Sequence, residues 1–231
     1  GEVHYHAGDQ YYASSDLLSD SQNNIQNQNT KLFLKACNKQ GFDPKDLLKY
    51  IKNFGNAHLL VIGDTILDQF VACDALGMSA EAPVIVAREL EAKNHLGGAS
   101  IVALHCKALG AECSYISVVG SDENSILIAN VLNKWDIEHD LVEDNSRPTT
   151  LKIRYMVEKQ KIFRLSKLKD HSINQIIEDK VISKIKEKAP FVNGILVSDF
   201  VYGIITPKVL KVIREQAKKY NIKIFGDLQC S

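Results

Sequence analysis

The sequence has 231 residues, of which 45% are hydrophobic and 24% are charged, the proportions of an ordinary soluble globular protein with a buried core. Lys and Arg (28) balance Asp and Glu (28), and no basic stripe gathers on one predicted face, which argues against nucleic acid as a partner. The apolar runs are far shorter than the roughly 20 residues that cross a bilayer. The amino end shows no leader pattern, so we expect a cytoplasmic protein without membrane contact.

The cysteines and histidines do not indicate a metal or disulfide framework. Five cysteines form an odd set without a C-x-x-C pair, which predicts reduced, mostly buried thiols. His4 and His6 alternate but have no third ligand nearby, so they fit an outward-facing strand better than a metal site. The cysteines are Cys37, Cys73, Cys106, Cys113 and Cys230.

The first part of the chain is predicted to contain a linker and a helix. Residues 19–30 are rich in Asn, Gln and Ser and carry one aliphatic residue, so this stretch is predicted to be an unstructured linker. Asp43 is placed to cap a helix that begins at Pro44 and ends before Gly55. The apolar side of this helix carries Leu47, Leu48, Ile51 and Phe54.

From residue 58 onward, short β-type runs alternate with amphipathic helical stretches. Buried-strand patterns occupy residues 58–63, 113–120, 141–143, 194–199 and 223–227. Helices are predicted at residues 97–110, 124–135 and 173–188, and from Pro207 after the cap Thr206. Two polar-alternating strands are predicted near residues 150–158 and 161–166. This rhythm predicts an α/β fold whose mainly parallel sheet is covered by helices on both faces.

Acidic residues recur directly after the predicted strands, where ligands of parallel sheets bind. They are Asp64, Asp122, Asp199 and Asp227. A carboxylate there can accept hydrogen bonds from sugar hydroxyls or hold magnesium near a phosphate. The alternative is that each aspartate caps the following helix, and Asp122 fits this role best.

Two segments resemble the ribokinase-like (PfkB) family of carbohydrate kinases. The run VIGDTILDQF at residues 61–70 is similar to that family's first strand and turn, whose GD-x-x-x-D pattern implies sugar contacts for Asp64 and Asp68. The run LGGASIVA at residues 96–103 resembles its first signature, in which Gly97 and Gly98 let the backbone approach the sugar. The resemblance implies a ribokinase-like fold with a small β lid.

Three further segments resemble the heptose-phosphate kinase branch, which acts in nucleotide-sugar biosynthesis. MSAEAPVIVARELE and RPTTLKIRYMVEKQKIFRLSK look like its lid strands, from residue 78 and from residue 147 respectively. In the second, Lys152, Arg154 and Arg164 would meet a sugar phosphate, although a solvated charged strand face is the alternative. SDFVYG resembles a segment that implies substrate contact for Asp199, and the last strand implies cofactor contact for Asp227.

The sequence also departs from the family pattern. Ile101 replaces an asparagine of the signature helix, Tyr202 a lysine, and Leu228-Gln229 a Pro-Lys pair. The family's Gly-Ala-Gly-Asp motif, whose aspartate is the catalytic base, is expected beyond Ser231, so no catalytic residue is assigned within these 231 residues. ATP and Mg²⁺ are the cofactors that the resemblance implies for the complete enzyme.

The amino-terminal run GEVHYHAGDQYYASSDLL resembles the end of a cytidylyltransferase-like domain. This predicts a nucleotidylyltransferase tail at residues 1–19, a linker and entry helix at 20–57, and the first part of a ribokinase-like kinase domain at 58–231. Such an arrangement fits a slice of a bifunctional kinase and nucleotidylyltransferase.

Two functional hypotheses remain open. The first is a fragment of an ATP-dependent kinase that phosphorylates a sugar phosphate such as a heptose 7-phosphate, as a possible homodimer through the lid strands. The second is a kinase-like module without catalysis that serves binding, regulation or dimerisation through its lid strands, which the substitutions at Ile101, Tyr202 and Leu228-Gln229 favour. A dinucleotide-dependent oxidoreductase is disfavoured, because GDTILD stands where G-x-G-x-x-G would be needed.

Overall fold

The structure, a computed structural model, describes residues 21–158 and 160–229, with side chains from residue 29 onward. The chain divides into two compact units, Gly1–Lys52 and Asn53–Ser231. The first unit contains α1 (Ser21–Gln40) and most of α2 (Pro44–Asn53). The predicted helix start at Pro44 is confirmed, and Asp43 Oδ1 accepts a hydrogen bond from Lys45 N at 2.8 Å. No residue of α2 is buried.

The linker predicted at residues 19–30 is wrong for its described part, because α1 begins at Ser21. Asn and Gln are weaker helix formers than Ala, but residues 21–40 contain no Gly or Pro that would end a helix. The polar composition suggested a linker, but the absence of helix-breaking residues was the better indicator of structure here. The predicted transferase tail at residues 1–19, with His4 and His6, lies outside the described residues.

Five parallel strands form the central sheet of the second unit, in the order β5-β4-β1-β8-β9. All five coincide with predicted strands, and their pairing confirms the parallel arrangement. β1 and β8 pair up to Gly63 and Ser198, so the residues that follow both strands meet at one edge of the sheet. The strands are β1 (His58–Gly63), β4 (Glu112–Val119), β5 (Glu138–Glu143), β8 (Gly194–Asp199) and β9 (Lys223–Leu228).

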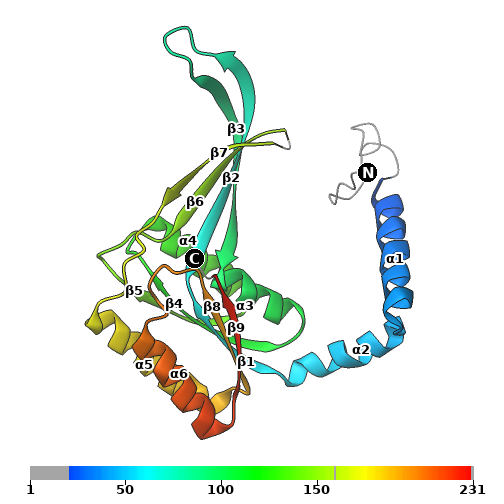
Figure 1. Ribbon diagram of the computed structural model, residues 1–231, viewed down its shortest axis with the longest axis vertical. Coiled ribbons are helices and arrows are strands. Elements are labelled where there is room, and N and C mark those ends of the chain that lie inside the picture. Colours follow the sequence, from blue (N-terminus) through cyan, green and yellow to red (C-terminus); the bar gives the residue numbers. More distant parts are fainter. Residues whose placement is uncertain (1–20, 159, 230–231) are drawn as a thin grey trace, which may run out of the picture. The chain divides into compact units, whose positions relative to one another are not determined.

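Helices cover both faces of this sheet, which confirms the predicted fold class (Figure 1). Val61 packs into a core shared with α3 (Ala99–Ala108) and α4 (Glu123–Lys134). Leu60 and Ile62 face the opposite core, which contains α5 (Gln175–Lys188) and α6 (Pro207–Tyr220). The alternation of side chains along β1 thus places both cores. Short 3₁₀ turns, η1 (Phe54–Asn56) and η2 (Ala189–Phe191), precede β1 and β8.

The predicted caps are also confirmed. Asp122 Oδ1 accepts a hydrogen bond from Ser125 N at 3.1 Å, at the start of α4. Thr206 Oγ1 accepts one from Val209 N at 3.1 Å, at the start of α6. Each bond satisfies one of the backbone N–H groups that a helix leaves free at its first turn.

A second sheet, here called the lid sheet, contains four strands in the order β3-β2-β6-β7. They are β2 (Thr65–Met78), β3 (Ile85–Gly98), β6 (Leu151–Val157) and β7 (Gln160–Lys167). The β2–β3 hairpin extends well beyond the other strands (Figure 1). Gly97 and Gly98 end β3, so α3 begins at Ala99, two residues later than expected. Only Asp64 separates β1 from β2.

Four of the five cysteines lie among the described residues, and all four are free thiols. Cys37, Cys73 and Cys113 are buried and Cys106 is partly buried, as predicted. Burial raises the pKa of Cys113 to about 12, which favours the protonated thiol at neutral pH. Among the described residues, no helix is both long and apolar enough to span a membrane.

Candidate functional site

Alternating side chains give the lid sheet one apolar face and one polar face. In β2, Leu67 and Val71 enter the core beside α3 and α4. In β6, Leu151 and Ile153 enter the same core. Because side chains alternate along a strand, Asp68 of β2 and Lys152 of β6, which pair in register, lie on the opposite face. This polar face is the candidate site.

Asp68 is at the centre of the candidate site. Its carboxylate forms an ion pair with Arg154 Nη1, and both side chains are about four-fifths buried. A Cβ atom on Gly97 would lie 2.5 Å from Asp68 Oδ2, so only glycine leaves room for this carboxylate against β3. A Cβ on Gly98, whose φ is 60°, would lie 2.3 Å from Asp64 O. The glycine pair therefore makes room for the two aspartates, a role that the sequence did not reveal.

The two cations of β6 are held over aromatic rings. Lys152 Nζ lies 5.5 Å from the ring centre of Phe200 and 5.2 Å from that of Tyr202. Arg154 Cζ lies 5.2 Å from the ring centre of Phe70. Such contacts attract a cation to the face of a ring and keep it partly desolvated.

Arg154 also faces a second arginine across the strands. Arg164 of β7 pairs directly with it and is exposed. Like charges directly opposite one another destabilise a sheet unless an anion lies between them. The structure thus brings Asp68, Lys152, Arg154 and Arg164 together, in an arrangement suited to an anionic, hydroxylated ligand.

Sequence reasoning missed Phe70, Phe200 and His95 of this face, and it noted Tyr202 only as the replacement of a family lysine. The rings of Phe70 and His95 meet edge-on, with their centres 5.5 Å apart, and His95 pairs in register with Asp68. Phe200 and Tyr202 approach from the loop after β8. Strand alternation could have revealed Phe70 and His95. Phe70 lies two residues after Asp68 in β2 and therefore on the same face, and His95 lies on that face as the register partner of Asp68 in β3. The two loop residues carried no such signal.

Asp64 is buried, with 1% of its surface exposed. Its Oδ2 accepts hydrogen bonds from Phe200 N at 2.8 Å and Tyr202 N at 3.2 Å, whereas Oδ1 has no hydrogen-bond partner among the described residues. Burial raises the pKa of Asp64 from 3.8 to about 6, against the lowering effect of the two N–H bonds. The carboxylate is directed at the loop, so in this conformation a sugar would not reach it.

Asp199 and Arg147 fix the same loop. Asp199 Oδ1 accepts a hydrogen bond from Val201 N at 2.8 Å. Arg147 is buried and donates from Nη1 to Tyr202 O at 2.8 Å. Its Nε donates to Asp144 Oδ2 at 2.8 Å. Burial opposes ionisation of Asp144, but bonds from Ser146 and Arg147 outweigh it and lower the pKa of Asp144. Arg147, expected at the start of the lid, is a loop anchor instead.

Asp227 is the residue expected to contact the cofactor. It is exposed near the carboxyl end of β9 and pairs in register with Ser198, one residue before Asp199. Two carboxylates at one sheet edge suit Mg²⁺, which binds one or two of them and keeps waters and phosphate oxygens as its other ligands. No group of three or more metal-ligating side chains occurs within the described part of the chain.

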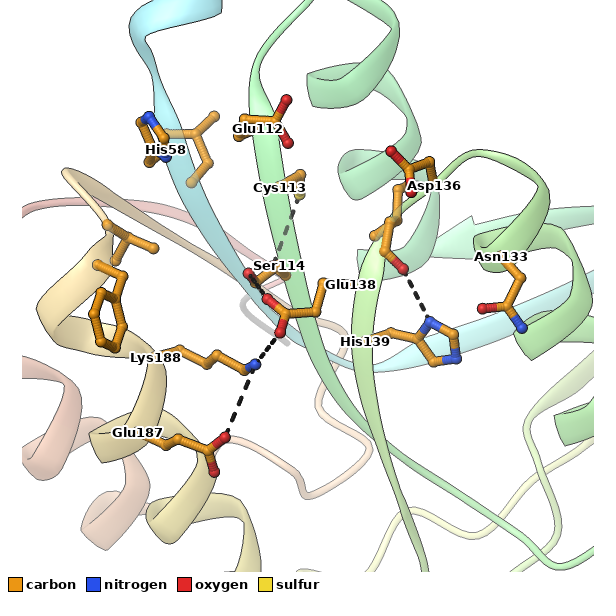
Figure 2. A pocket seen from close by; sticks show the side chains of 14 residues that line it. His58, Glu112, Cys113, Ser114, Asn133, Asp136, Glu138, His139, Glu187 and Lys188 are labelled. Carbon is orange, nitrogen blue, oxygen red and sulfur yellow. Dashed lines mark hydrogen bonds and ion pairs between the residues drawn. The ribbon is translucent and has the colours of Figure 1, made fainter.

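A cavity of about 830 Å³ lies at the opposite edge of the parallel sheet, at the amino ends of β1, β4 and β5 (Figure 2). Its charges are largely paired within the protein. Glu138 accepts hydrogen bonds from Lys188 Nζ and from Ser114 Oγ, and Glu112 forms an ion pair with Lys107 at 3.2 Å. Ligands of parallel sheets bind at the carboxyl ends, so this hollow is a weaker candidate than the polar face of the lid sheet.

Comparison with known proteins places this geometry in a family. Residues 56–201 match the profile of the pfkB family of carbohydrate kinases. The bifunctional protein HldE of Campylobacter jejuni is 33% identical over 170 residues, which cover 73% of this chain and 35% of that protein. HldE of Geobacter sulfurreducens is 33% identical over 184 residues, covering 79% and 38%. This chain thus spans little more than a third of the length of these relatives.

Solved structures agree in fold. Phosphofructokinase-2 from Escherichia coli in complex with fructose-6-phosphate aligns over 76% of this chain and 55% of its own, with a TM-score of 0.58 at 15% identity. Ribokinase from Giardia lamblia aligns over 75% and 55%, with a TM-score of 0.55 at 12% identity. These similarities support the α/β architecture alone, whereas the profile match covers more than half of the sequence. The chain therefore belongs to the PfkB family of carbohydrate kinases.

Proposed function

We propose that this chain holds the sugar in an ATP-dependent kinase that phosphorylates a sugar phosphate, with a heptose 7-phosphate as the leading substrate. The observation that carries this proposal is the grouping of one carboxylate, Asp68, with Lys152, Arg154 and Arg164 on one face of the lid sheet. A neutral sugar would need hydroxyl-binding groups, but it would give no reason for three cations on adjacent strands.

Each group has a role in this proposal. Asp68 accepts hydrogen bonds from sugar hydroxyls, and Gly97 and Gly98 bring the backbone close to the same sugar. Arg154 and Arg164 bind the phosphate that the substrate already carries, because a phosphate dianion favours charge-assisted, bidentate donors. Lys152, held beside two rings, adds a third positive charge. The aromatic faces of Phe70 and Tyr202 pack against the C–H faces of the sugar.

ATP and Mg²⁺ are the cofactors that we infer for the reaction. Asp227, with Asp199 beside it, is the residue of this chain that would hold a magnesium ion. The ion would neutralise charge on the phosphates of ATP during transfer. The match to bifunctional relatives supports, in addition, a place for the kinase in a longer polypeptide that makes a nucleotide-activated sugar. The cytoplasmic location stays a prediction.

A homodimer through the lid sheet forms part of the proposal. The outer half of the β2–β3 hairpin carries apolar side chains that are more than half exposed. They are Leu76, Met78, Ile85 and Leu90. Exposed apolar side chains gathered on one hairpin often mark a contact with another protein. Leu76→Glu is expected to shift the mass measured by light scattering from dimer to monomer, and a chain that is monomeric at all concentrations would exclude the dimer.

The same exposed apolar side chains are the observation that favours the alternative, a kinase-like module that dimerises without catalysis. The two readings differ in ligand binding. A module without a substrate should not bind a sugar phosphate at Asp68 and Arg154, whereas the kinase should.

A thermal-shift titration tests the proposed function. A ligand that binds only the folded protein raises its melting temperature as its concentration rises. Heptose 7-phosphate is titrated against the wild type, Asp68→Asn and the control Asp74→Asn, whose residue lies farther along β2 in an exposed ion pair with Arg88. We expect saturable stabilisation that Asp68→Asn weakens at least tenfold in affinity and Asp74→Asn leaves unchanged. No stabilisation by any sugar phosphate, with or without ATP and Mg²⁺, would favour the alternative.

A further inference from the structure

The loop Asp199–Gly203 after β8 is held by two buried charged side chains from distant parts of the chain. Asp64 Oδ2 accepts hydrogen bonds from Phe200 N and Tyr202 N. Arg147 Nη1 donates to the carbonyl oxygen of Tyr202 at 2.8 Å, so the N–H and the C=O of Tyr202 are both bonded. The peptide groups on both sides of Tyr202 are therefore fixed by an acceptor and a donor at once.

The backbone conformation of this loop is unfavourable by itself. Val201 has a φ of 63°, a left-handed conformation that β-branched residues rarely adopt. Gly203 has a φ of 91°, and a Cβ there would lie 2.3 Å from His171 O. Strained residues persist when surrounding contacts over-determine them. Asp64, Arg147 and the bond from Val201 N to Asp199 Oδ1 are those contacts.

The loop carries the two rings that hold Lys152. Phe200 and Tyr202 lie 6.4 Å apart between ring centres, and the ammonium of Lys152 is within 5.5 Å of both. We propose that Asp64 and Arg147 are positioning residues, which set the conformation of the Asp199–Gly203 loop so that its two rings hold the Lys152 ammonium in the substrate site.

Neither residue is placed to contact substrate, because both are buried. Asp64 is 1% exposed; its Oδ2 accepts two loop N–H bonds, and its Oδ1, which has no hydrogen-bond partner among the described residues, is buried as well. Arg147 donates to Asp144 from Nε, to Tyr202 O from Nη1 and to His171 O from Nη2. Their effect on a ligand therefore passes through the loop and Lys152. The two aspartates of the GD-x-x-x-D pattern thus have different roles. Asp68 lies in the site, whereas Asp64 holds the loop that packs against Lys152.

A ligand-free measurement tests this directly. Reductive ¹³C-dimethylation of lysines keeps their charge and gives each an NMR signal, and the signal of Lys152 is identified by its loss in Lys152→Arg. Ring currents of Phe200 and Tyr202 displace this signal from those of exposed lysines. Asp64→Leu removes the acceptor, whereas the matched Asp64→Asn keeps a carbonyl oxygen of the same shape. We expect Asp64→Leu to move the signal to the exposed-lysine position and Asp64→Asn to retain the displacement.

A Lys152 signal that stays at its wild-type position in Asp64→Leu would overturn the proposal. If circular dichroism shows that Asp64→Leu does not fold, Arg147→Lys gives the second test. Lysine keeps a positive charge beside Asp144 but loses the fork that reaches both Tyr202 O and His171 O. Arg147→Lys should likewise move the Lys152 signal to the exposed-lysine position, and a Lys152 signal that keeps its wild-type position would again reject the positioning role.

A second arm of the experiment, which rests on the proposed function, uses heptose 7-phosphate affinity. Lys152→Met and Asp64→Leu should each weaken binding by about tenfold, as expected for the loss of one charge-assisted contact. The double variant should be no weaker than Lys152→Met alone, because both changes act through one ammonium. A double variant whose loss of affinity equals the product of the two single losses would reject the proposal. Absence of binding by the wild type would reject the proposed function, while the NMR result still decides the positioning role.

Discussion

Substitution of Asp64 by Asn should change the pH dependence of stability. Burial raises the pKa of Asp64 from 3.8 to about 6, so the folded protein favours the protonated carboxyl. The resulting contribution to stability is fully present below pH 3.8 and is lost as the pH rises through about 6. At about 1.4 kcal/mol per pH unit, the buried charge costs the wild type ~3 kcal/mol at pH 7 relative to the protonated form.

Asn keeps an acceptor for Phe200 N and Tyr202 N without the charge. The free energy of unfolding of Asp64→Asn minus that of the wild type should therefore increase by about 2–3 kcal/mol between pH 4 and pH 7. Urea denaturation of both proteins across this range measures the difference. Any constant effect of the amide cancels, because only the change with pH is used. A difference that stays flat, or that falls as the pH rises, would refute the reasoning.

Three further predictions follow from contacts described above. Gly97→Ala places a methyl group 2.5 Å from Asp68 Oδ2, so sugar phosphate affinity should fall at least tenfold in calorimetry; unchanged affinity would show that Asp68 does not bind the ligand. Arg147→Met leaves Asp144 buried and uncompensated, and should cost about 3–5 kcal/mol in urea denaturation, with partial recovery when Asp144→Asn is added. Tyr115→Phe removes a buried hydroxyl that bonds Thr65 Oγ1, which also donates to Ser117 Oγ at 2.6 Å, and should cost about 1–2 kcal/mol by the same method; a neutral effect would mean that the bond to Ser117 alone satisfies Thr65.

The central sheet could be predicted from sequence because its strands are buried. Runs such as residues 58–63 are apolar at nearly every position, and caps such as Thr206-Pro207 mark where the intervening helices begin. The β2–β3 hairpin gave no comparable signal of its own. Most of β3 is exposed, so its sequence lacks the alternation that a half-buried strand shows. Similarity to a known family indicated lid strands there only from residue 78 onward, so β2 was not predicted.

The site was predictable in its residue types but not in its geometry. The spacing of Asp64 and Asp68 suggested two equivalent carboxylates. They differ because the chain passes from one sheet to the other at Asp64, so one side chain turns into the protein and the other onto the polar face of the lid sheet. Phe200 and Tyr202 could not be assigned to Lys152, since the contact joins a loop and a strand nearly fifty residues apart.

The one-residue junction between β1 and β2 also determines how the lid sheet can move. Asp64 N donates to Ser198 O at 3.1 Å, and Asp64 O accepts from Ala99 N at 2.9 Å, so the root of β2 is clamped on both sides. The register of β2 with β3 first shifts between Ala72 and Cys73, and again between Ala75 and Gly77. Bulges are where a strand bends. We therefore expect the hairpin to bend at these two register shifts, which lie beyond Asp68, while the hydrogen bonds at the start of β2 hold Asp68 beside Arg154.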